Sequence, residues 1–200
     1  AGTFNISEPD LLVSSAIILT DFNGFSVSCF ADSNGLAEVV YSGGTSTYEV
    51  LWSNGDTTDI ADSLAVGTFN VLVTDTNGCE INASVTLNEP PLLELSADSS
   101  AVSCFGGADG FIDLTVVGGV PTYSFDWSNL ETEEDTDSLI AGSYAVTVTD
   151  LNGCSDTLSS TITEPEAPVS ITETHINIDC FGIDHIVQPY VKFFQRKYKN

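Results

Sequence analysis

The sequence has almost no positive charge. Its 200 residues include 29 acidic side chains and four basic ones, and all four basic residues lie at or after Lys192. A surface this negative repels nucleic-acid phosphates and anionic lipid headgroups. The composition therefore argues against nucleic-acid binding and against electrostatic docking on a membrane. It favours association with cations.

A long apolar run and a well-placed histidine are also lacking. The longest apolar stretch, near Leu11–Leu19, is interrupted by Ser14 and Ser15 and is too short to span a bilayer. Both histidines, His175 and His185, lie beyond the repeats described below, so no recurring unit holds a histidine-based nucleophile and base. We therefore predict no membrane insertion and no enzymatic activity.

A repeat of 75 residues organises the sequence. Trp52 and Trp127 are separated by this offset, and so are five other pairs. These pairs are Cys29 and Cys104, Cys79 and Cys154, Tyr48 and Tyr123, Asp75 and Asp150, and the Glu-Pro pairs that begin at Glu89 and Glu164. A third copy begins near Cys180, which follows Cys104 by 76 residues. Such self-similarity indicates a tandem array of structural units.

Within each copy, apolar side chains alternate with polar ones. Tyr123–Trp127 and Tyr144–Val148 each place every second side chain on one face of a strand, while Asn152 and Gly153 form a typical hairpin turn. Short strands at this spacing, with no helical pattern, predict an all-β fold of tandem Ig-like β-sandwiches. The alternation assigns Trp52, Trp127 and Tyr144 to the core. An exposed platform for sugar rings is the alternative for the two tryptophans.

Proline-rich joints set the expected domain boundaries. Asn88–Pro91 and Glu164–Pro168 should be stiff and extended, which predicts that the repeats form a rod. The expected divisions are the end of a preceding repeat (1–9), a first repeat (10–90), a second repeat (91–165), the start of a third (166–182) and a basic tail that departs from the pattern (183–200). Because the sequence begins at Ala1 without a leader, we expect it to be a mature or excised part of a longer secreted protein.

Three motifs of the second repeat resemble the SprB-type adhesin repeat. They are Val102–Gly110, Tyr123–Asn129 and Ala141–Cys154, and the first repeat matches more loosely, with a short insertion before Cys29. The resemblance implies large cell-surface proteins of tandem Ig-like or PKD-like repeats, exported by the type IX pathway, some of which serve attachment and gliding motility. It implies an extracellular location and a surface polysaccharide or other cell-surface ligand.

Each complete repeat contains two cysteines, and a secreted chain is expected to form disulfides. We favour pairing within repeats, Cys29–Cys79 and Cys104–Cys154, which leaves Cys180 unpaired. Each bridge would close a loop of about 50 residues and contribute about 4 kcal/mol. This scheme requires a sandwich with one strand fewer than usual, so that the two turns meet at one end. The alternative scheme is Cys79–Cys104 with Cys154–Cys180.

A Thr-Asp-x-Asn-Gly motif begins at Thr20, Thr74 and Thr149. Its Asp and Asn resemble the first half of a calcium loop, but they are also typical of a hairpin turn. We favour the turn, because no bidentate glutamate follows at EF-hand spacing. Calcium at a repeat junction remains a hypothesis, since it would offset the net charge of −25. The candidate ligands are Asp75, Asn77, Asp150, Asn152, Asp109 and Asp113.

Asp followed by Ser or Thr is similar to the O-glycosylation sequon of bacteria that use such adhesins. The candidate acceptors are Thr57, Ser63, Ser138 and Thr157. Unmodified surface hydroxyls are the alternative.

These observations favour a structural segment of a secreted surface adhesin. Two alternatives stay open. One is a carbohydrate-binding or spacer module of a secreted multidomain hydrolase, and the other is a subunit of a self-assembling surface filament.

Overall fold

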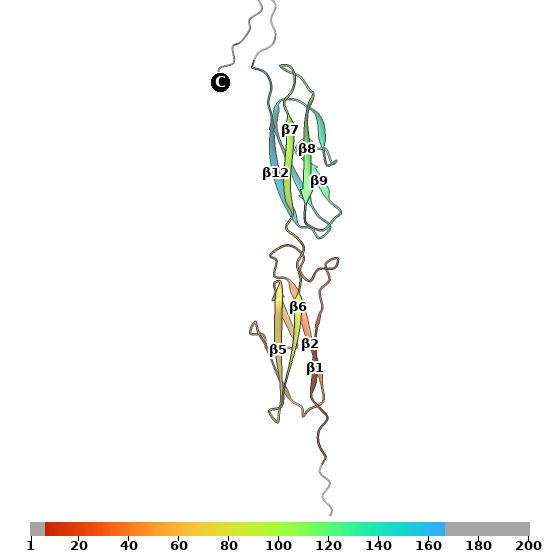
Figure 1. The fold of residues 1–200 in the computed structure, drawn as a ribbon, viewed down its shortest axis with the longest axis vertical. Coiled ribbons are helices and arrows are strands. Elements are labelled where there is room, and N and C mark those ends of the chain that lie inside the picture. Colours follow the sequence, from red (N-terminus) through yellow and green to blue (C-terminus); the bar gives the residue numbers. More distant parts are fainter. Residues whose placement is uncertain (1–6, 167–200) are drawn as a thin grey trace, which may run out of the picture. The chain divides into compact units, whose positions relative to one another are not determined.

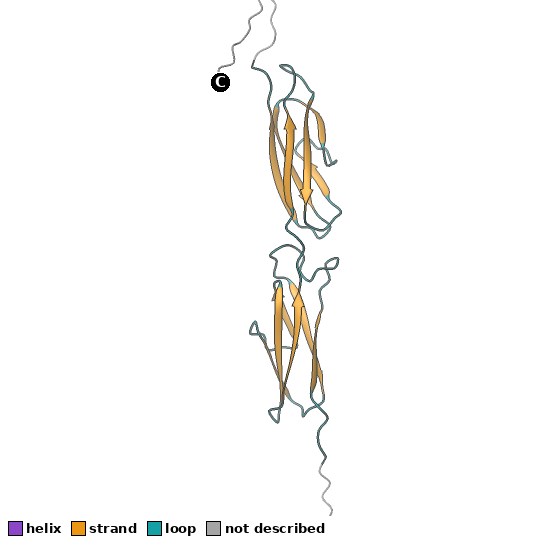
Figure 2. Ribbon diagram, in the orientation of Figure 1, coloured by secondary structure: helices purple, strands orange, loops and turns teal. Residues whose placement is uncertain are grey.

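The computed structural model describes residues 7–166, which fold into strands and loops without a helix (Figures 1 and 2). The prediction of an all-β fold of tandem Ig-like sandwiches is confirmed. In the described part of the chain there is no helix long and apolar enough to cross a membrane. The third copy with Cys180 and the basic tail lie outside the described residues, as do residues 1–6 of the expected preceding repeat.

Six strands build each sandwich. The first sandwich contains β1 (Val13–Ile18), β2 (Gly35–Ser42), β3 (Tyr48–Trp52), β4 (Ile60–Leu64), β5 (Gly67–Asp75) and β6 (Glu80–Leu87). The second contains β7 (Glu94–Ser100), β8 (Gly110–Val117), β9 (Ser124–Trp127), β10 (Thr136–Leu139), β11 (Gly142–Thr149) and β12 (Ser155–Ile162).

Each sandwich packs two three-stranded antiparallel sheets against each other. The sheets of the first are ordered β1-β2-β4 and β3-β5-β6, and those of the second are ordered β7-β8-β10 and β9-β11-β12. The two sandwiches therefore repeat one topology, as the sequence offset predicts. Their hydrophobic clusters are separate, with Trp52 in one and Trp127 in the other.

The two tryptophans lie in the cores, as the alternation along their strands predicts. Trp52 is 1% exposed and Trp127 is 2% exposed. Each indole N–H is paired inside the protein, that of Trp52 with the Thr58 carbonyl at 3.0 Å and that of Trp127 with the Glu133 carbonyl at 2.9 Å. A buried donor that is paired in this way costs little on folding. The tryptophan faces are therefore not available as a platform for sugars.

Tyr144 lies at the corner between the sheets rather than deep in the core. Its hydroxyl donates to the Ile140 carbonyl at 3.0 Å, which is the bond of an Ig-type tyrosine corner. The ring is only partly buried, at the edge of the second hydrophobic cluster. The equivalent residue of the first sandwich is Phe69, which has no hydroxyl to make this bond.

The chain crosses from one sheet to the other between β9 and β10 without reversing direction. Both strands run opposite to β11, since β9 pairs with it antiparallel and β10 turns back into it within two residues. Each sandwich has one strand fewer than a seven-stranded Ig domain, as the predicted cysteine pairing requires. The loop that crosses between the sheets takes the place of the missing strand, so the later strands keep the directions that they have in an Ig domain. The turn after β7 and the turn after β11 consequently lie at opposite ends of the sandwich.

Candidate functional site

The turn between β11 and β12 is built around the buried carboxylate of Asp150. One carboxylate oxygen accepts the N–H groups of Asn152 and Cys154, each at 2.9 Å. The other accepts the N–H of Val120 at 2.8 Å. Three N–H donors on one carboxylate fix the turn, so the side chains of Asn152 and Cys154 are held in defined positions.

The first sandwich has the same turn between β5 and β6. Asp75 accepts the N–H groups of Asn77, Cys79 and Thr45, each at 2.9 Å. The N–H groups of Cys79 and Thr45 hold the pKa of the Asp75 carboxyl below its ordinary value of 3.8. This Asp-based construction explains why the motif recurs.

The turn between β1 and β2 presents Cys29. The Ser28 N–H donates to the Asn34 side chain at 3.1 Å, and the Ala31 N–H donates to the carboxylate of Glu89 at 2.8 Å. Glu89 belongs to the proline-rich joint, so this turn is tied to the segment that leads into the second sandwich. Ala31 has a φ of 61°, a conformation that few non-glycine residues adopt.

A disulfide between Cys29 and Cys154 connects the two sandwiches. The two residues are 125 positions apart, and their Cα atoms are 5.7 Å apart. Hydrogen bonds accompany it: the Asn152 side-chain amide donates to the carbonyls of Ser28 at 3.0 Å and Phe22 at 3.1 Å, and Asn23 donates to the Asn152 side-chain oxygen at 2.6 Å. We call this set of contacts the junction.

The prediction of disulfides within each repeat is wrong. Cys29 bonds to Cys154 of the other sandwich, while Cys79 and Cys104 are free and exposed. The reason is the crossing from β9 to β10, which keeps the two cysteine-bearing turns of one sandwich at opposite ends. The alternative scheme, Cys79–Cys104 with Cys154–Cys180, is wrong too. Cys79 and Cys104 are not bonded to each other, and Cys154 is bonded to Cys29. Cys180 lies outside the described residues.

The junction uses residues that the sequence did not single out for this role. Phe22 and Asn23 belong to the insertion before Cys29, where a bridge joins Phe22 to Phe25 and the Gly24 N–H donates to Asp21 at 2.7 Å. Two of the three Thr-Asp-x-Asn-Gly motifs thus contact each other. The sequence held one indication of this role: the insertion that distinguishes the first repeat from the second contains an additional Thr-Asp-x-Asn-Gly motif, which begins at Thr20.

The candidate calcium ligands either accept hydrogen bonds from backbone N–H groups of turns or lie away from those turns. Asp75 and Asp150 use their carboxylate oxygens for backbone N–H groups, and Asp109 accepts the Ser103 N–H at 3.0 Å. Asp113 lies on β8, away from these turns. Among residues 7–166, no three His, Cys, Asp or Glu side chains are grouped closely enough to hold a metal ion. The hydrogen bonds therefore favour the turn interpretation.

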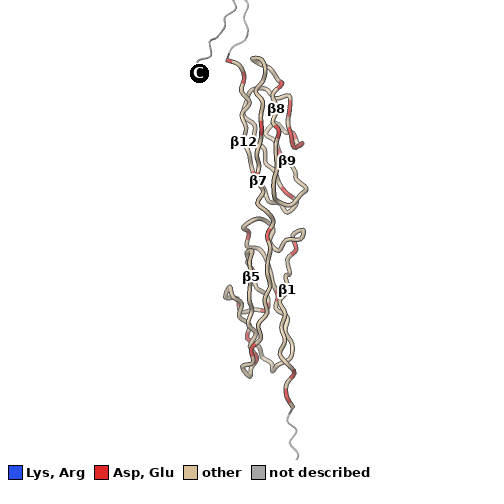
Figure 3. Tube along the Cα trace, viewed as in Figure 1, with Lys and Arg blue, Asp and Glu red and all other residues tan. Residues whose placement is uncertain are grey.

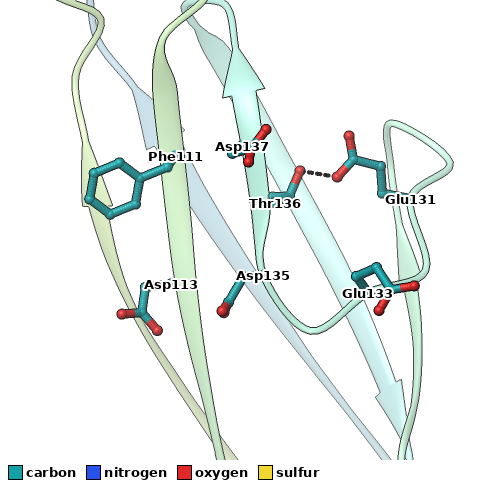
Figure 4. Close-up of a pocket in the computed structure, with 7 residues that line it drawn as sticks. All are labelled: Phe111, Asp113, Glu131, Glu133, Asp135, Thr136 and Asp137. Atoms are coloured by element: carbon teal, nitrogen blue, oxygen red, sulfur yellow. Dashed lines mark hydrogen bonds between the residues drawn. The ribbon is translucent and has the colours of Figure 1, made fainter.

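Asp113 lines a shallow acidic groove on the second sandwich (Figure 4). Its other lining residues are Phe111, Glu131, Glu133, Asp135, Thr136 and Asp137. The Thr136 hydroxyl donates to the Glu131 carboxylate, and the Leu114 N–H donates to Asp135 at 2.9 Å. In Figure 4 the carboxylates spread along the groove rather than converge on one point.

Acidic residues are scattered along the chain of both sandwiches, and residues 7–166 contain no lysine or arginine (Figure 3). The candidate glycan acceptors Thr57, Ser63, Ser138 and Thr157 are all exposed. Exposure is necessary for modification, and an intact mass of the native protein is the measurement that would detect it.

Comparison with known proteins gives one family match. The family model described as the SprB repeat matches residues 26–57 and 96–132. The first segment covers β2 and β3, and the second covers most of β7, all of β8 and all of β9. No curated protein sequence matches the chain.

Solved structures of adhesion proteins show a distant likeness. The eight N-terminal Ig domains of a Down Syndrome Cell Adhesion Molecule isoform are 14% identical with a TM-score of 0.36, over 77% of this chain and 25% of that one. Murine CEACAM1b is 12% identical with a TM-score of 0.27, over 78% of this chain and 100% of that one. A tetra-tandem repeat from the extending region of a large adhesion protein is 14% identical with a TM-score of 0.21, over 74% and 48%.

This chain thus spans a quarter of the length of the first of these structures. At such TM-scores the likeness says nothing about function. The family match is stronger evidence than these structural likenesses, because it falls on both sandwiches and on the same part of the repeat in each. Both sandwiches match the SprB repeat, which confirms the resemblance inferred from the sequence motifs.

Proposed function

We propose that this chain is a structural segment of a cell-surface adhesin, in which cross-linked repeats carry load and set reach. The observation that carries the proposal is the disulfide between Cys29 and Cys154, which connects two sandwiches that have separate hydrophobic cores. Domains joined by a linker alone move relative to each other by default. A covalent bond and three side-chain hydrogen bonds restrict that motion, which suits a spacer that holds a binding part away from a cell.

The disulfide also limits how far the chain can be stretched. Force applied at the two ends passes through the Cys29–Cys154 bond and bypasses the residues between them. That loop spans 125 positions, or about 440 Å of extended chain at about 3.5 Å per residue. The bond therefore protects every strand from β2 to β11 from extension under load.

Single-molecule pulling on the full chain tests this role. In the oxidised protein, complete unfolding should release a contour length about 440 Å shorter than in the reduced protein. The double variant Cys79→Ser with Cys104→Ser keeps the Cys29–Cys154 bond and should behave like the oxidised wild type. Equal contour lengths with and without reductant would sink the load-bearing proposal.

The family match supports an extracellular location and attachment as the setting for this segment. Gliding motility and a polysaccharide ligand belong to the same proposal, and so does a rod-like array. We include the absence of enzymatic activity, which is supported by the lack of any histidine in residues 7–166. Small-angle scattering of the full chain would test the rod.

One observation favours the alternative of a carbohydrate-binding module. A groove on the first sandwich is lined by Tyr41, Tyr48, Glu49 and Asp59 among other residues. The two tyrosine rings are 4.8 Å apart, and the Tyr41 hydroxyl donates to Asp59 at 2.9 Å. Aromatic rings beside carboxylates are a chemistry that suits sugar rings and their hydroxyls.

A glycan array separates the two functions. If the groove binds sugars, the full chain should bind a defined glycan, and Tyr41→Val should abolish that binding. Valine is a tolerated replacement, because Val116 occupies the equivalent position of the second sandwich. Absence of glycan binding by the wild type would leave the structural segment as the better account.

A further inference from the structure

Cys79 and Cys104, the two cysteines that are free within residues 7–166, lie in turns that have the same construction as the two halves of the junction. In the turn after β7, the Ser103 N–H donates to Asp109 at 3.0 Å, the Gly106 N–H to Glu164 at 2.8 Å, and the Gly107 N–H to the Cys104 carbonyl at 2.9 Å. These bonds match, position by position, those that fix the turn of Cys29. Cys104 is therefore presented as Cys29 is.

The same holds for the other half of the junction. Asp75 fixes Asn77 and Cys79 with the bonds that Asp150 makes to Asn152 and Cys154. Residues 7–166 thus carry one complete junction, one free half at Cys104 and one free half at Cys79. Both free cysteines are exposed.

The residues around the free halves are more exposed than their counterparts in the complete junction. Pro90, in the joint between the sandwiches, is fully buried, whereas the equivalent Pro9 and Pro165 are exposed. Asn77 is exposed and donates to Thr45 within its own sandwich at 2.9 Å, whereas Asn152 is half-buried. The free halves have the construction of an interface, and no other segment of residues 7–166 is bonded to their cysteines.

We infer that Cys104 and Cys79 are the open halves of a second junction, whose partner is another copy of this repeat: the turn of Cys104 takes the turn of Cys79 of a second chain, head to tail. The incoming Asn77 amide then donates to the Ser103 carbonyl, as Asn152 does to Ser28. This deepens the proposed function, on whose junction it rests, by naming the partner that extends the array.

The covalent step is a thiol–disulfide exchange. With oxidised glutathione as the oxidant, the Cys104 thiolate attacks one glutathione sulfur and releases one glutathione thiol. The Cys79 thiolate of the second chain then attacks the Cys104 sulfur of the mixed disulfide and releases the second glutathione thiol. Two protein thiols and one glutathione disulfide give one protein disulfide and two glutathione thiols.

The open junction lacks one feature of the complete one. The turn of Cys104 has no counterpart of the insertion that carries Phe22 and Asn23, so two of the three hydrogen bonds of Asn152 have no equivalent. Association before bond formation should therefore be weak and should rise with protein concentration. The disulfide is then what makes the assembly persist.

A mixing experiment with the full chain tests the inference. Cys180→Ser in every sample removes the fifth cysteine of the sequence. The chain with Cys79→Ser is then mixed with a mass-tagged chain with Cys104→Ser in a glutathione buffer. We expect the Cys104–Cys79 heterodimer to exceed either homodimer at least about tenfold, because only this pair completes the junction. Non-reducing mass spectrometry identifies the linked peptides.

A further variant makes the test specific to the junction geometry. Asn77→Ala in the Cys104→Ser chain should lower the yield of heterodimer severalfold, since it removes the incoming amide. The exposed Asn82 on β6 gives the matched control, and Asn82→Ala should leave the yield unchanged. Dimers in the proportions of random thiol pairing, or no dimer at all, would overturn the inference while leaving the mechanical role of the Cys29–Cys154 bond intact.

Discussion

The side-chain amide of Asn152 donates to the carbonyl oxygen of Ser28 at 3.0 Å, although 124 residues separate the two positions in the sequence. The Cys154 sulfur lies 3.3 Å from the same carbonyl. One turn of the second sandwich therefore meets one turn of the first through a disulfide and an amide–carbonyl hydrogen bond.

Peptide mapping checks the pairing itself. Because residues 7–166 contain no lysine or arginine, a glutamate-specific protease is the suitable enzyme. The protease does not cut the Glu-Pro bonds after Glu8 and Glu164, so under non-reducing conditions we expect residues 1–38, which contain Cys29, to be linked to residues 135–166, which contain Cys154. A link between residues 1–38 and residues 50–80, which contain Cys79, would instead support the predicted pairing within the first repeat.

Removal of the bond should destabilise the joined state and leave both sandwiches folded. Cys29→Ser with Cys154→Ser opens a loop of 125 positions, for which the chain-entropy model gives about 5 kcal/mol. The cores are separate, so circular dichroism should show unchanged strand content while calorimetry shows a lower melting temperature. Cys79→Ser with Cys104→Ser is the control, and it should leave the melting temperature unchanged.

Asn152→Ala should make the disulfide easier to reduce. The variant loses three hydrogen bonds at the junction, each worth about 1 kcal/mol, so the equilibrium with glutathione should shift towards the thiols by an order of magnitude or more. The equivalent Asn77→Ala removes a bond within the first sandwich only and should leave that equilibrium unaffected. Equal shifts for both variants would contradict the role of Asn152.

Asp75→Asn should make stability less dependent on pH. The folded pKa of Asp75 is below its ordinary value, so the ionised carboxylate stabilises the fold. This contribution is fully present above the ordinary carboxyl pKa and is lost as pH falls through the folded pKa. The stability difference between wild type and variant should therefore shrink in acid, as measured by urea unfolding across a pH series. Asn82→Ala, at an exposed position on β6, removes no titratable group and is the control that should leave the pH dependence unchanged.

Trp127→Ala should destabilise the second sandwich by about 3–5 kcal/mol, because it empties a large part of a closed core. Leu130 is 87% exposed, so Leu130→Ala should change the free energy of unfolding by less than about 0.5 kcal/mol. Denaturant unfolding measures both. A near-neutral Trp127→Ala would mean that this side chain serves recognition rather than packing.

Calcium should leave the melting temperature unchanged, whether it is added or removed with EDTA. Asp75 and Asp150 already have backbone N–H groups on both carboxylate oxygens, so a cation would have to displace these bonds. A rise in melting temperature with calcium would instead support the hypothesis of a cation at the repeat junction.

The sequence by itself determined the repeat, the strands and their inward-facing residues. Trp52 and Trp127 could be assigned to the core because side chains alternate between the two faces of a strand, a property of the local backbone. The Thr-Asp-x-Asn-Gly turns could be predicted because they too depend on local interactions. Asp75 and Asp150 accept hydrogen bonds from N–H groups only two residues further along the chain.

Only the tertiary structure decided which cysteines meet. The two candidate turns of one repeat lie at opposite ends because β9 and β10 run in the same direction, and nothing in the local pattern near Trp127 states that direction. Counting cysteines could not separate the two pairing schemes, because each leaves one cysteine unpaired, and the favoured pairing within repeats was wrong. The bond between Cys29 and Cys154 follows from how the strands are connected and from the neighbouring repeat, and both are long-range properties of the folded chain.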